Sequence, residues 1–147
     1  MDLKLIGGFD EQDIYAKKCL ELIDKNNFEY ISNLDQKDLI KYYYSAKVHA
    51  LPSWYETPGL SSMEAACGGC NILSTDRGST KEYFGNYATY CNPFSQDSIT
   101  VGLKRAYEKK PSFKLRKIII DKYTWNLAAK DTLRGYKKAL SRSKPAI

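Results

Sequence analysis

The sequence predicts an α/β fold of the doubly wound, Rossmann-like class, in which a parallel sheet carries helices on both faces. Short apolar runs that end in Gly, Pro or polar residues alternate with amphipathic helical segments along the whole chain. Strands that are separated by helices pair in parallel, because each crossover helix returns the chain to the same end of the sheet. The chain has 147 residues and 43% hydrophobic residues. We therefore expect a single domain over 1–147, with a loose tail at 141–147.

Each expected strand is short and bounded by turn residues. The strands are expected at 3–7, 28–32, 47–53, 71–75 and 88–91. Helical periodicity predicts helices at 11–25, 35–44, 59–68, about 81–84 and 95–109, and one short and one longer helix between 113 and 141. Three of these helices have an apolar face that should point inward. The face of the helix at 11–25 consists of Ile14, Cys19, Leu20, Leu22 and Ile23. That of the helix at 59–68 consists of Leu60, Met63 and Cys67, and that of the helix at 95–109 of Ile99, Leu103, Ala106 and Tyr107.

Charge is distributed unevenly along the chain. Residues 1–100 hold 9 basic and 14 acidic residues, whereas residues 101–147 hold 14 basic and 3 acidic ones. Such a basic end is typical of a solvated helix surface, but it also suits phosphate, an acidic protein or acidic lipid. Because the basic helices contain no nucleic-acid reading motif, we do not expect a nucleic-acid partner. Peripheral contact with the inner face of a membrane, aided by Trp125, is the alternative.

The cysteines and the histidine favour structural roles in a cytoplasmic protein. No run approaches the ~20 apolar residues of a membrane span, and Met1 is not followed by a signal sequence. We expect reduced, structural thiols at Cys19, Cys67, Cys70 and Cys91. A redox pair in "CGGC" is disfavoured because Cys67 falls near a helix end, and the four cysteines lack the spacing of a zinc site. His49 lies mid-strand, where a packed residue is expected rather than a base.

The stretch "YETPGLSSME" after the third expected strand is the best candidate site. In parallel sheets, ligands bind beyond the carboxyl ends of strands, at loops that lead into helices. If the helix begins near Gly59, the first amides, around Leu60, point to the loop and form an anion site. Gly59 lets a phosphate approach the backbone, and Pro58 stiffens the entry to the helix. The pattern predicts a phosphate-binding turn.

Two glutamates flank this turn. Glu64 lies four residues after Leu60, beside the inward stripe, where vicinal ribose hydroxyls could serve as its donors. Glu56 would lie on the other side of the phosphates, near the group that they carry. The spacing alone also fits an exposed loop acid at Glu56 and a salt-bridged helix acid at Glu64.

The segment "ALPSWYETPGLSSMEAACGGCNILSTDRGSTKEYFG" resembles the nucleotide-sugar half of glycosyltransferase family 4, retaining enzymes of the two-domain GT-B architecture. The family pattern runs Pro-Ser, Glu, a Gly-containing turn and a second Glu. The residues that match it are Pro52, Ser53, Glu56, Gly59, Glu64, Ala65, Gly69, Gly78 and Glu82. The upstream "FEYISNLDQKDLIKYYYSAKV" and downstream "CNPFSQDSITVGLKRAYE" are also similar, so the resemblance covers about residues 3–110.

The resemblance implies a role for each matched position. Glu64 would hold the ribose, the amides at Gly59 and Leu60 the diphosphate, and Glu56 the hydroxyls of the donor sugar. The backbone near Asn33 and Leu34 would meet the base. No metal is expected, since the family needs none for transfer. The implied function is hexosyl transfer from a nucleotide-diphosphate sugar to a glycan or lipid-linked acceptor, as in polysaccharide biosynthesis.

The sequence also departs from the family pattern. Ser32 stands where the base-binding turn usually has Gly, Pro58 where Phe is common and Asn71 where Pro is frequent. The family has a further strand and helix with an Arg and a Lys that grip the diphosphate, and an acceptor-binding N-terminal domain. Neither precedes this match, so we expect a partial chain that is inactive alone, with Arg77 and Lys81 as candidate replacements. The alternative is a non-catalytic nucleotide-binding or interaction module with the same fold.

Overall fold

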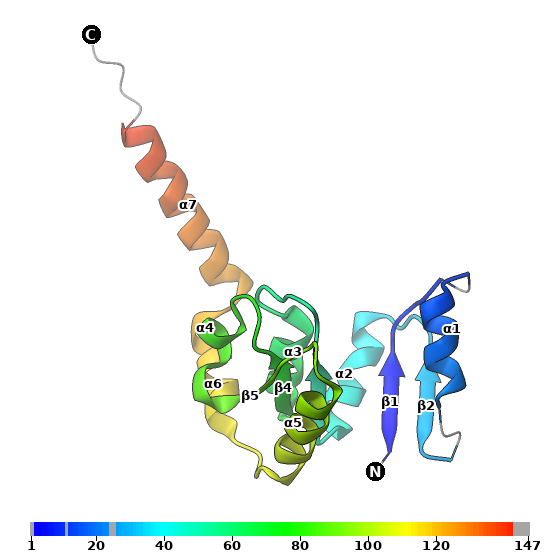
Figure 1. Cartoon of the computed structure of the whole chain (residues 1–147). Coiled ribbons are helices and arrows are strands. Elements are labelled where there is room, and N and C mark those ends of the chain that lie inside the picture. Colours follow the sequence, from blue (N-terminus) through cyan, green and yellow to red (C-terminus); the bar gives the residue numbers. More distant parts are fainter. Residues whose placement is uncertain (1, 11, 24–25, 143–147) are drawn as a thin grey trace. The chain divides into compact units, whose positions relative to one another are not determined.

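The computed structural model describes residues 2–10, 12–23 and 26–142, and its elements alternate between strand and helix as predicted (Figure 1). The chain divides into two compact units, Met1–Lys41 and Tyr42–Ile147. All strand pairs in the described residues are parallel, which confirms the α/β class. Of the loose tail expected at 141–147, residues 143–147 lie outside the described part, and residues 141 and 142 still belong to the last helix.

The first unit is built on two parallel strands. The strands β1 (Leu3–Ile6) and β2 (Phe28–Ile31) pair in register from Leu3 opposite Phe28 to Ile6 opposite Ile31. Helix α1 (Ile14–Glu21) connects them, and α2 (Gln36–Ser45) leads into the second unit. The Asp13 carboxylate accepts hydrogen bonds from the amides of Tyr15 and Ala16 and so fixes the start of α1.

The expected inward face of α1 is not buried. Ile14 is 71% exposed and Leu22 87% exposed, and α1 contains no buried residue. The prediction from periodicity was therefore wrong for this helix. Its partner surface is a sheet of only two strands within the first unit, and two strands offer too little apolar area to cover a helix.

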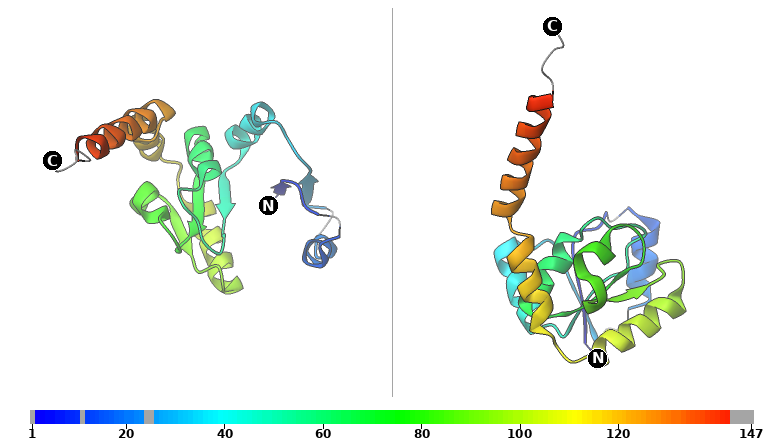
Figure 2. Two further views of the ribbon diagram at one scale, coloured as in Figure 1. Left: turned by 90° about the horizontal axis from the view of Figure 1, so that it is seen from above. Right: turned by 90° about the vertical axis from the view of Figure 1, so that its left-hand side faces the viewer.

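The second unit has a three-stranded parallel sheet in the order β3-β4-β5 (Figure 2). Its strands are β3 (Val48–Leu51), β4 (Asn71–Thr75) and β5 (Thr89–Cys91). The helices between and after them are α3 (Leu60–Gly68), α4 (Thr80–Phe84) with the short 3₁₀ turn η1 (Gly85–Tyr87), α5 (Gln96–Glu108), α6 (Phe113–Lys122) and α7 (Trp125–Arg142). The expected strands are thus all present, but they form two sheets rather than one continuous sheet.

The core of the second unit lies around the central strand. Every residue of β4 is buried, as expected for a strand with neighbours on both sides and helices on its faces. Leu73 packs with Cys91 and Ala106, and Ile99 and Leu103 of α5 pack against this cluster. Tyr107, expected inward, is 40% exposed. Its ring instead contacts Lys47, whose ammonium sits 4.1 Å from the ring centroid.

Asn71 fastens α5 to the start of β4. Its buried side-chain amide donates to the carbonyls of Ala106, at 3.0 Å, and Lys109, at 2.7 Å. These carbonyls lie at the C-terminal end of α5, where carbonyls have no partner within a helix. Asn71, which departs from the family pattern, therefore has a structural role: it satisfies carbonyls at the C-terminal end of α5.

The last two helices differ in burial. Helix α6 packs on α3 and buries Leu115 and Ile119. Tyr123 then anchors the chain on α4, because its ring lies 5.1 Å from that of Tyr83. Helix α7 follows, with the Thr124 hydroxyl accepting from the Leu127 amide, and none of its residues is buried. Of the helices that the structure describes, none is long and apolar enough to cross a membrane.

Candidate functional site

The loop after β3 holds Glu56 in a defined position at the carboxyl edge of the sheet. Glu56 is half-buried. Its carboxylate accepts hydrogen bonds from the Ser53 hydroxyl at 3.3 Å and from the Thr57 amide at 3.2 Å. Its own amide donates to the Arg77 carbonyl at 3.4 Å, and its carbonyl accepts from the Ser79 amide at 3.0 Å. Glu56 is therefore held by both side-chain and backbone bonds, rather than being a loosely exposed loop acid.

Gly78 allows the loops after β3 and β4 to meet. Glu56 and Gly78 form an isolated parallel bridge, and Gly78 has a left-handed φ of 87°. A Cβ atom at this position would lie 2.1 Å from the Glu56 carbonyl oxygen. No side chain can occupy that space, so glycine is required for the two loops to interlock.

Helix α3 begins directly beside Glu56. Gly59 is its N-cap residue, with a left-handed φ of 68°, and as a glycine it has no side chain that could cap the first turn. A Cβ at Gly59 would lie 3.3 Å from Glu56 Cγ. Pro58 precedes this turn and is half-buried. The uncapped amides and the helix dipole give this corner a positive potential, which suits an anionic ligand.

The buried face of α3 differs from the predicted one. Met63 is buried as expected, but Leu60 is 54% exposed and Cys67 is half-buried. The other buried residues of α3 are Ser62, Ala65 and Ala66. The prediction of an inward Leu60 was wrong, because small residues allow α3 to lie close to the sheet along a different face. Leu60 instead projects from the first turn.

Glu64 contacts the preceding helix α2. The Tyr43 hydroxyl donates to Glu64 Oε2 over 3.4 Å, a long hydrogen bond, and Glu64 is half-buried. Burial and the nearby Glu64 carboxylate raise the pKa of Tyr43 to about 12. Tyr43 therefore stays protonated at neutral pH and remains a donor to this carboxylate. Sequence reasoning missed Tyr43, because only the fold shows that the last turn of α2 lies beside α3.

The residues expected to meet a base belong to the other unit. Asn33 and Leu34 lie in the loop after β2, in the first unit. The Asn33 side chain occupies the space beside Gly8, where an added Cβ would lie 2.7 Å from Asn33 Oδ1. Within the second unit, the structure brings together Glu56, Pro58, Gly59 and the first turn of α3.

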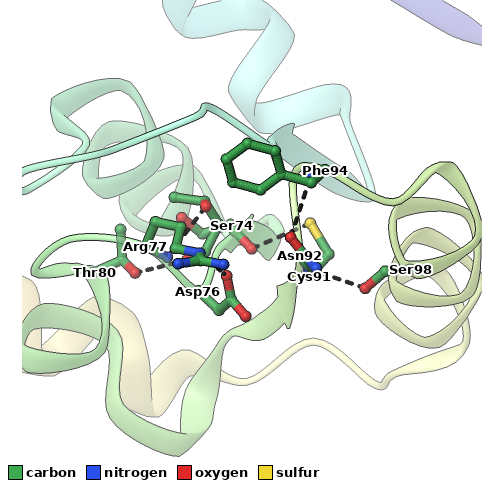
Figure 3. A network of polar contacts seen from close by, with 9 residues as sticks. Ser74, Asp76, Arg77, Thr80, Cys91, Asn92, Phe94 and Ser98 are labelled. Atoms are coloured by element: carbon green, nitrogen blue, oxygen red, sulfur yellow. Dashed lines mark hydrogen bonds and ion pairs between the residues drawn. The ribbon is translucent and has the colours of Figure 1, made fainter.

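A second polar network follows β4 and β5 at the same edge of the sheet (Figure 3). Arg77 contacts Asp76 through Nε at 3.5 Å, and its guanidinium lies 5.3 Å from the Phe94 ring centroid. Phe94 in turn contacts Trp54 edge to face, with centroids 4.3 Å apart. The Arg77 carbonyl also accepts a hydrogen bond from the Glu56 amide, so Arg77 adjoins the loop after β3. The Lys81 ammonium instead lies over the ring of Tyr90. Of the two basic candidates, Arg77 is the better placed.

The histidine and the cysteines do not form a reactive centre. Burial lowers the pKa of His49 to about 4, so the ring is neutral at pH 7, and it packs against the ring of Tyr43. This confirms a packed histidine. Burial raises the pKa of Cys70 to about 11, and its thiol donates to the Tyr43 carbonyl at 3.0 Å. All four cysteines are free thiols. Within residues 2–10, 12–23 and 26–142, no three His, Cys, Asp or Glu residues gather as metal ligands do.

Comparison with known proteins agrees with this geometry. The family model described as "Glycosyl transferases group 1" matches residues 1–123. An uncharacterized glycosyltransferase of Methanocaldococcus jannaschii is 26% identical over 145 residues, covering 94% of this chain and 37% of the relative. A probable sucrose-phosphate synthase of Thermosipho melanesiensis is 30% identical over 138 residues, covering 88% of this chain and 32% of the relative.

Solved structures share the fold. Sucrose-phosphate synthase from Thermosynechococcus elongatus matches with a TM-score of 0.81 and 20% identity, over 97% of this chain and 39% of that chain. A glycosyltransferase from Rickettsia africae matches with a TM-score of 0.81 and 19% identity, over 95% of this chain and 40% of that chain. These matches confirm the GT-B type of α/β fold. The chain spans about a third of the length of the curated relatives it matches.

Proposed function

The chain belongs to the group 1 glycosyl transferase family, and we propose that it is the C-terminal, donor-binding part of a retaining, family 4 glycosyltransferase. It binds a nucleotide-diphosphate sugar. The sugar passes to a glycan or lipid-linked acceptor, which an acceptor-binding domain outside this sequence would hold. The chain by itself would bind the donor without completing the transfer.

One arrangement carries the proposal: the uncapped first turn of α3 beside the fixed carboxylate of Glu56. A diphosphate needs donors that approach closely, and the Gly59 turn supplies backbone amides with little steric hindrance. A sugar linked to that diphosphate needs acceptors for its hydroxyls, which a half-buried carboxylate supplies. The two requirements of a nucleotide sugar are therefore met within four residues.

Glu64 is the proposed ribose ligand. A carboxylate has about four acceptor positions, so it can accept hydroxyls of a ribose in addition to the bond from Tyr43. Because Tyr43 stays protonated at neutral pH, it always presents its hydrogen to Glu64. The backbone at Asn33 and Leu34 is the proposed contact of the base.

During transfer, negative charge develops on the leaving diphosphate. The amides around Gly59 and Leu60, with the dipole of α3, would stabilise this charge without moving, so no reorganisation would be needed during the reaction. Arg77 would add a positive charge from the adjoining loop. Glu56 would orient the sugar so that it is attacked on the face that retains its configuration. We propose that no metal takes part.

Nucleotide binding by the whole chain tests the proposal. We would titrate it with UDP, GDP and ADP by calorimetry, together with Glu64→Gln and, as a matched control, Glu108→Gln on the exposed side of α5. We expect one of the three nucleotides to bind. Glu64→Gln should weaken its binding by about 1–3 kcal/mol, because the ribose hydroxyls would lose the charged carboxylate to which they donate. The control should bind as the parent does.

Two results would contradict the proposal. One is a folded chain that binds none of the three nucleotides at millimolar concentration. The other is binding that Glu64→Gln and Glu108→Gln change equally. Circular dichroism spectra of all three proteins establish that each is folded before either result is interpreted.

A further inference from the structure

A pair of polar side chains joins strand β3 to helix α3 behind the candidate site. The Nδ1 atom of His49, on β3, lies 3.5 Å from the hydroxyl oxygen of Ser62, on α3, a long hydrogen bond. Ser62 is fully buried and His49 is half-buried. A buried hydroxyl without a partner is costly, so the contact with His49 offsets the burial of Ser62. Two apolar side chains would pack here without that cost, so packing alone does not explain the pair.

Ser62 belongs to the part of α3 that would receive the ligand. It is the third residue of the helix, so its backbone amide is one of those that a helix leaves without an internal partner. A Cβ atom added at Gly59 would lie 3.5 Å from the Ser62 hydroxyl oxygen, so Ser62 directly adjoins the turn. The backbone of Ser62 is therefore part of the proposed diphosphate site, while its side chain is held by His49.

The ring of His49 is itself held in place. It packs edge to face on the ring of Tyr43, with centroids 5.8 Å apart and an interplanar angle of 61°. Tyr43 is fixed in turn, because the Cys70 thiol donates to its carbonyl at 3.0 Å and a Cβ atom at Gly68 would lie 2.9 Å from its backbone. Since burial keeps His49 neutral at pH 7, its ring has one donor and one acceptor nitrogen. The Ser62 hydroxyl can donate or accept, so it suits either tautomer of the ring.

We infer that His49 is a positioning residue of the nucleotide site, which fixes the first turn of α3 through its contact with Ser62. The inference rests on the proposed function, because it assigns a support to the turn that would bind the diphosphate. Backbone amides stabilise an anion best when they are already oriented toward it, and a shift of the turn would lengthen their hydrogen bonds. Because Tyr43 donates to Glu64, the same ring lies between the supports of both proposed ligand groups. His49 would act without touching the nucleotide.

Calorimetry of the whole chain tests the inference, with whichever of UDP, GDP and ADP the parent binds. His49→Phe keeps a ring beside Tyr43 but removes Nδ1, and Ser62→Ala removes the hydroxyl. Each should weaken binding by about three- to tenfold, comparable to the loss of one hydrogen bond. The double variant should lose no more than the single ones, because both break the same contact. His49→Asn, whose amide offers a hydrogen-bonding atom near the position of Nδ1, should bind within about twofold of the parent.

Two controls separate positioning from a general loss of stability. Asn71→Ala removes a buried amide at the opposite, amino end of β4, and should leave nucleotide affinity within about twofold of the parent. The chain contains a single histidine, so the NMR signal of a histidine ring belongs to His49. Saturating nucleotide should shift this signal in the parent, and the shift should largely disappear in Ser62→Ala. Circular dichroism establishes which variants are folded, and Ser62→Ala with the ring signal decides if His49→Phe is not.

Three results would overturn the inference while the proposed function stands, since in each of them the parent binds a nucleotide. The first is a folded His49→Phe or Ser62→Ala that binds as tightly as the parent. The second is a double variant whose loss is the product of the two single losses, because the two residues would then act independently. The third is a loss from Asn71→Ala as large as that from His49→Phe, which would mean that reduced stability weakens binding. If the parent binds none of the three nucleotides, the proposed function and this inference fail together.

Discussion

Replacing Gly78 by alanine should disrupt the candidate site more than any other single methyl addition to its loops. Gly78 has a φ of 87°, and the added Cβ would lie 2.1 Å from the carbonyl oxygen of Glu56. The left-handed backbone alone costs about 1–2 kcal/mol for a residue with a side chain. Relieving the contact must then move the Glu56 backbone, which breaks the bonds to Arg77 and Ser79. Each of these contributes about 0.5–1.5 kcal/mol.

Gly69→Ala is the matched control. Gly69 has a φ of 98°, but nothing lies within 4 Å of its added Cβ. The free energy of unfolding of Gly69→Ala should therefore fall by only about 1–2 kcal/mol, the cost of the left-handed backbone. That of Gly78→Ala should fall by about 2–5 kcal/mol. Urea unfolding followed by circular dichroism measures both. Gly78→Ala should also bind a nucleotide sugar more weakly than the parent in urea-free buffer, since Glu56, the proposed partner of the sugar hydroxyls, is displaced.

The reasoning about the interlocked loops fails if the two variants are equally stable. It also fails if Gly78→Ala binds the nucleotide sugar as the parent does, because Glu56 would then keep its place without the bridge. A crystal structure of Gly78→Ala would show directly whether the Glu56 carbonyl has moved away from residue 78.

Three further substitutions test other parts of the second unit. The pKa of His49 is about 4 in the folded chain and about 6.5 when unfolded, so the unfolded state binds more protons between these values. Stability should therefore fall by up to about 3 kcal/mol as the pH drops from 6.5 to 4, and His49→Gln should remove this slope from urea unfolding measured at several pH values. Asn71→Ala should cost about 1–3 kcal/mol in urea unfolding, because the buried carbonyl of Ala106 loses its donor, and an unchanged midpoint would contradict this. Gly102→Ala places a Cβ 2.8 Å from Leu73 Cδ1 and should cost about 1–3 kcal/mol by thermal unfolding; an unchanged melting temperature would contradict this.

The elements of this fold could be predicted from the sequence because their signals are local. Asp13 and Ser95 cap α1 and α5 where a polar residue precedes an apolar periodicity. Gly59 begins α3 where Pro-Gly follows a strand. Such signals depend on a few neighbouring residues, and the structure preserves them to within a few positions.

The faces of the helices were less predictable, because burial depends on what packs against them. The periodicity of α1 is sound, yet Ile14 and Leu22 remain exposed beside a two-stranded sheet. On α3, Ser62 is fully buried and Leu60 is exposed, the reverse of their hydrophobicity. Small residues are favoured where α3 packs closely on β3 and β4. The periodicity of a sequence does not reveal how closely a helix will approach a sheet.

The contacts that define the candidate site join residues far apart in the sequence, and no local pattern reveals them. The Tyr43 hydroxyl and Glu64 are 21 residues apart, and the bridge from Glu56 to Gly78 spans 22 positions. Spacing could therefore identify the two glutamates as a pair, but not the residues that hold them.

These supporting contacts decide what the glutamates can do. A carboxylate on a mobile loop would lose conformational entropy on binding a sugar, and it would be free to turn toward the α3 amides and compete with a phosphate for them. Glu56 is restrained on three sides, by Ser53, by Thr57 and by the backbone bridge to the next strand's loop. The orientation of Glu56 is therefore fixed before any ligand arrives. The conformational entropy of its side chain is lost when the chain folds, not when the sugar binds. The Gly78 bridge thus links the stability of the loop to the affinity of the site, so both should fall together when it is broken.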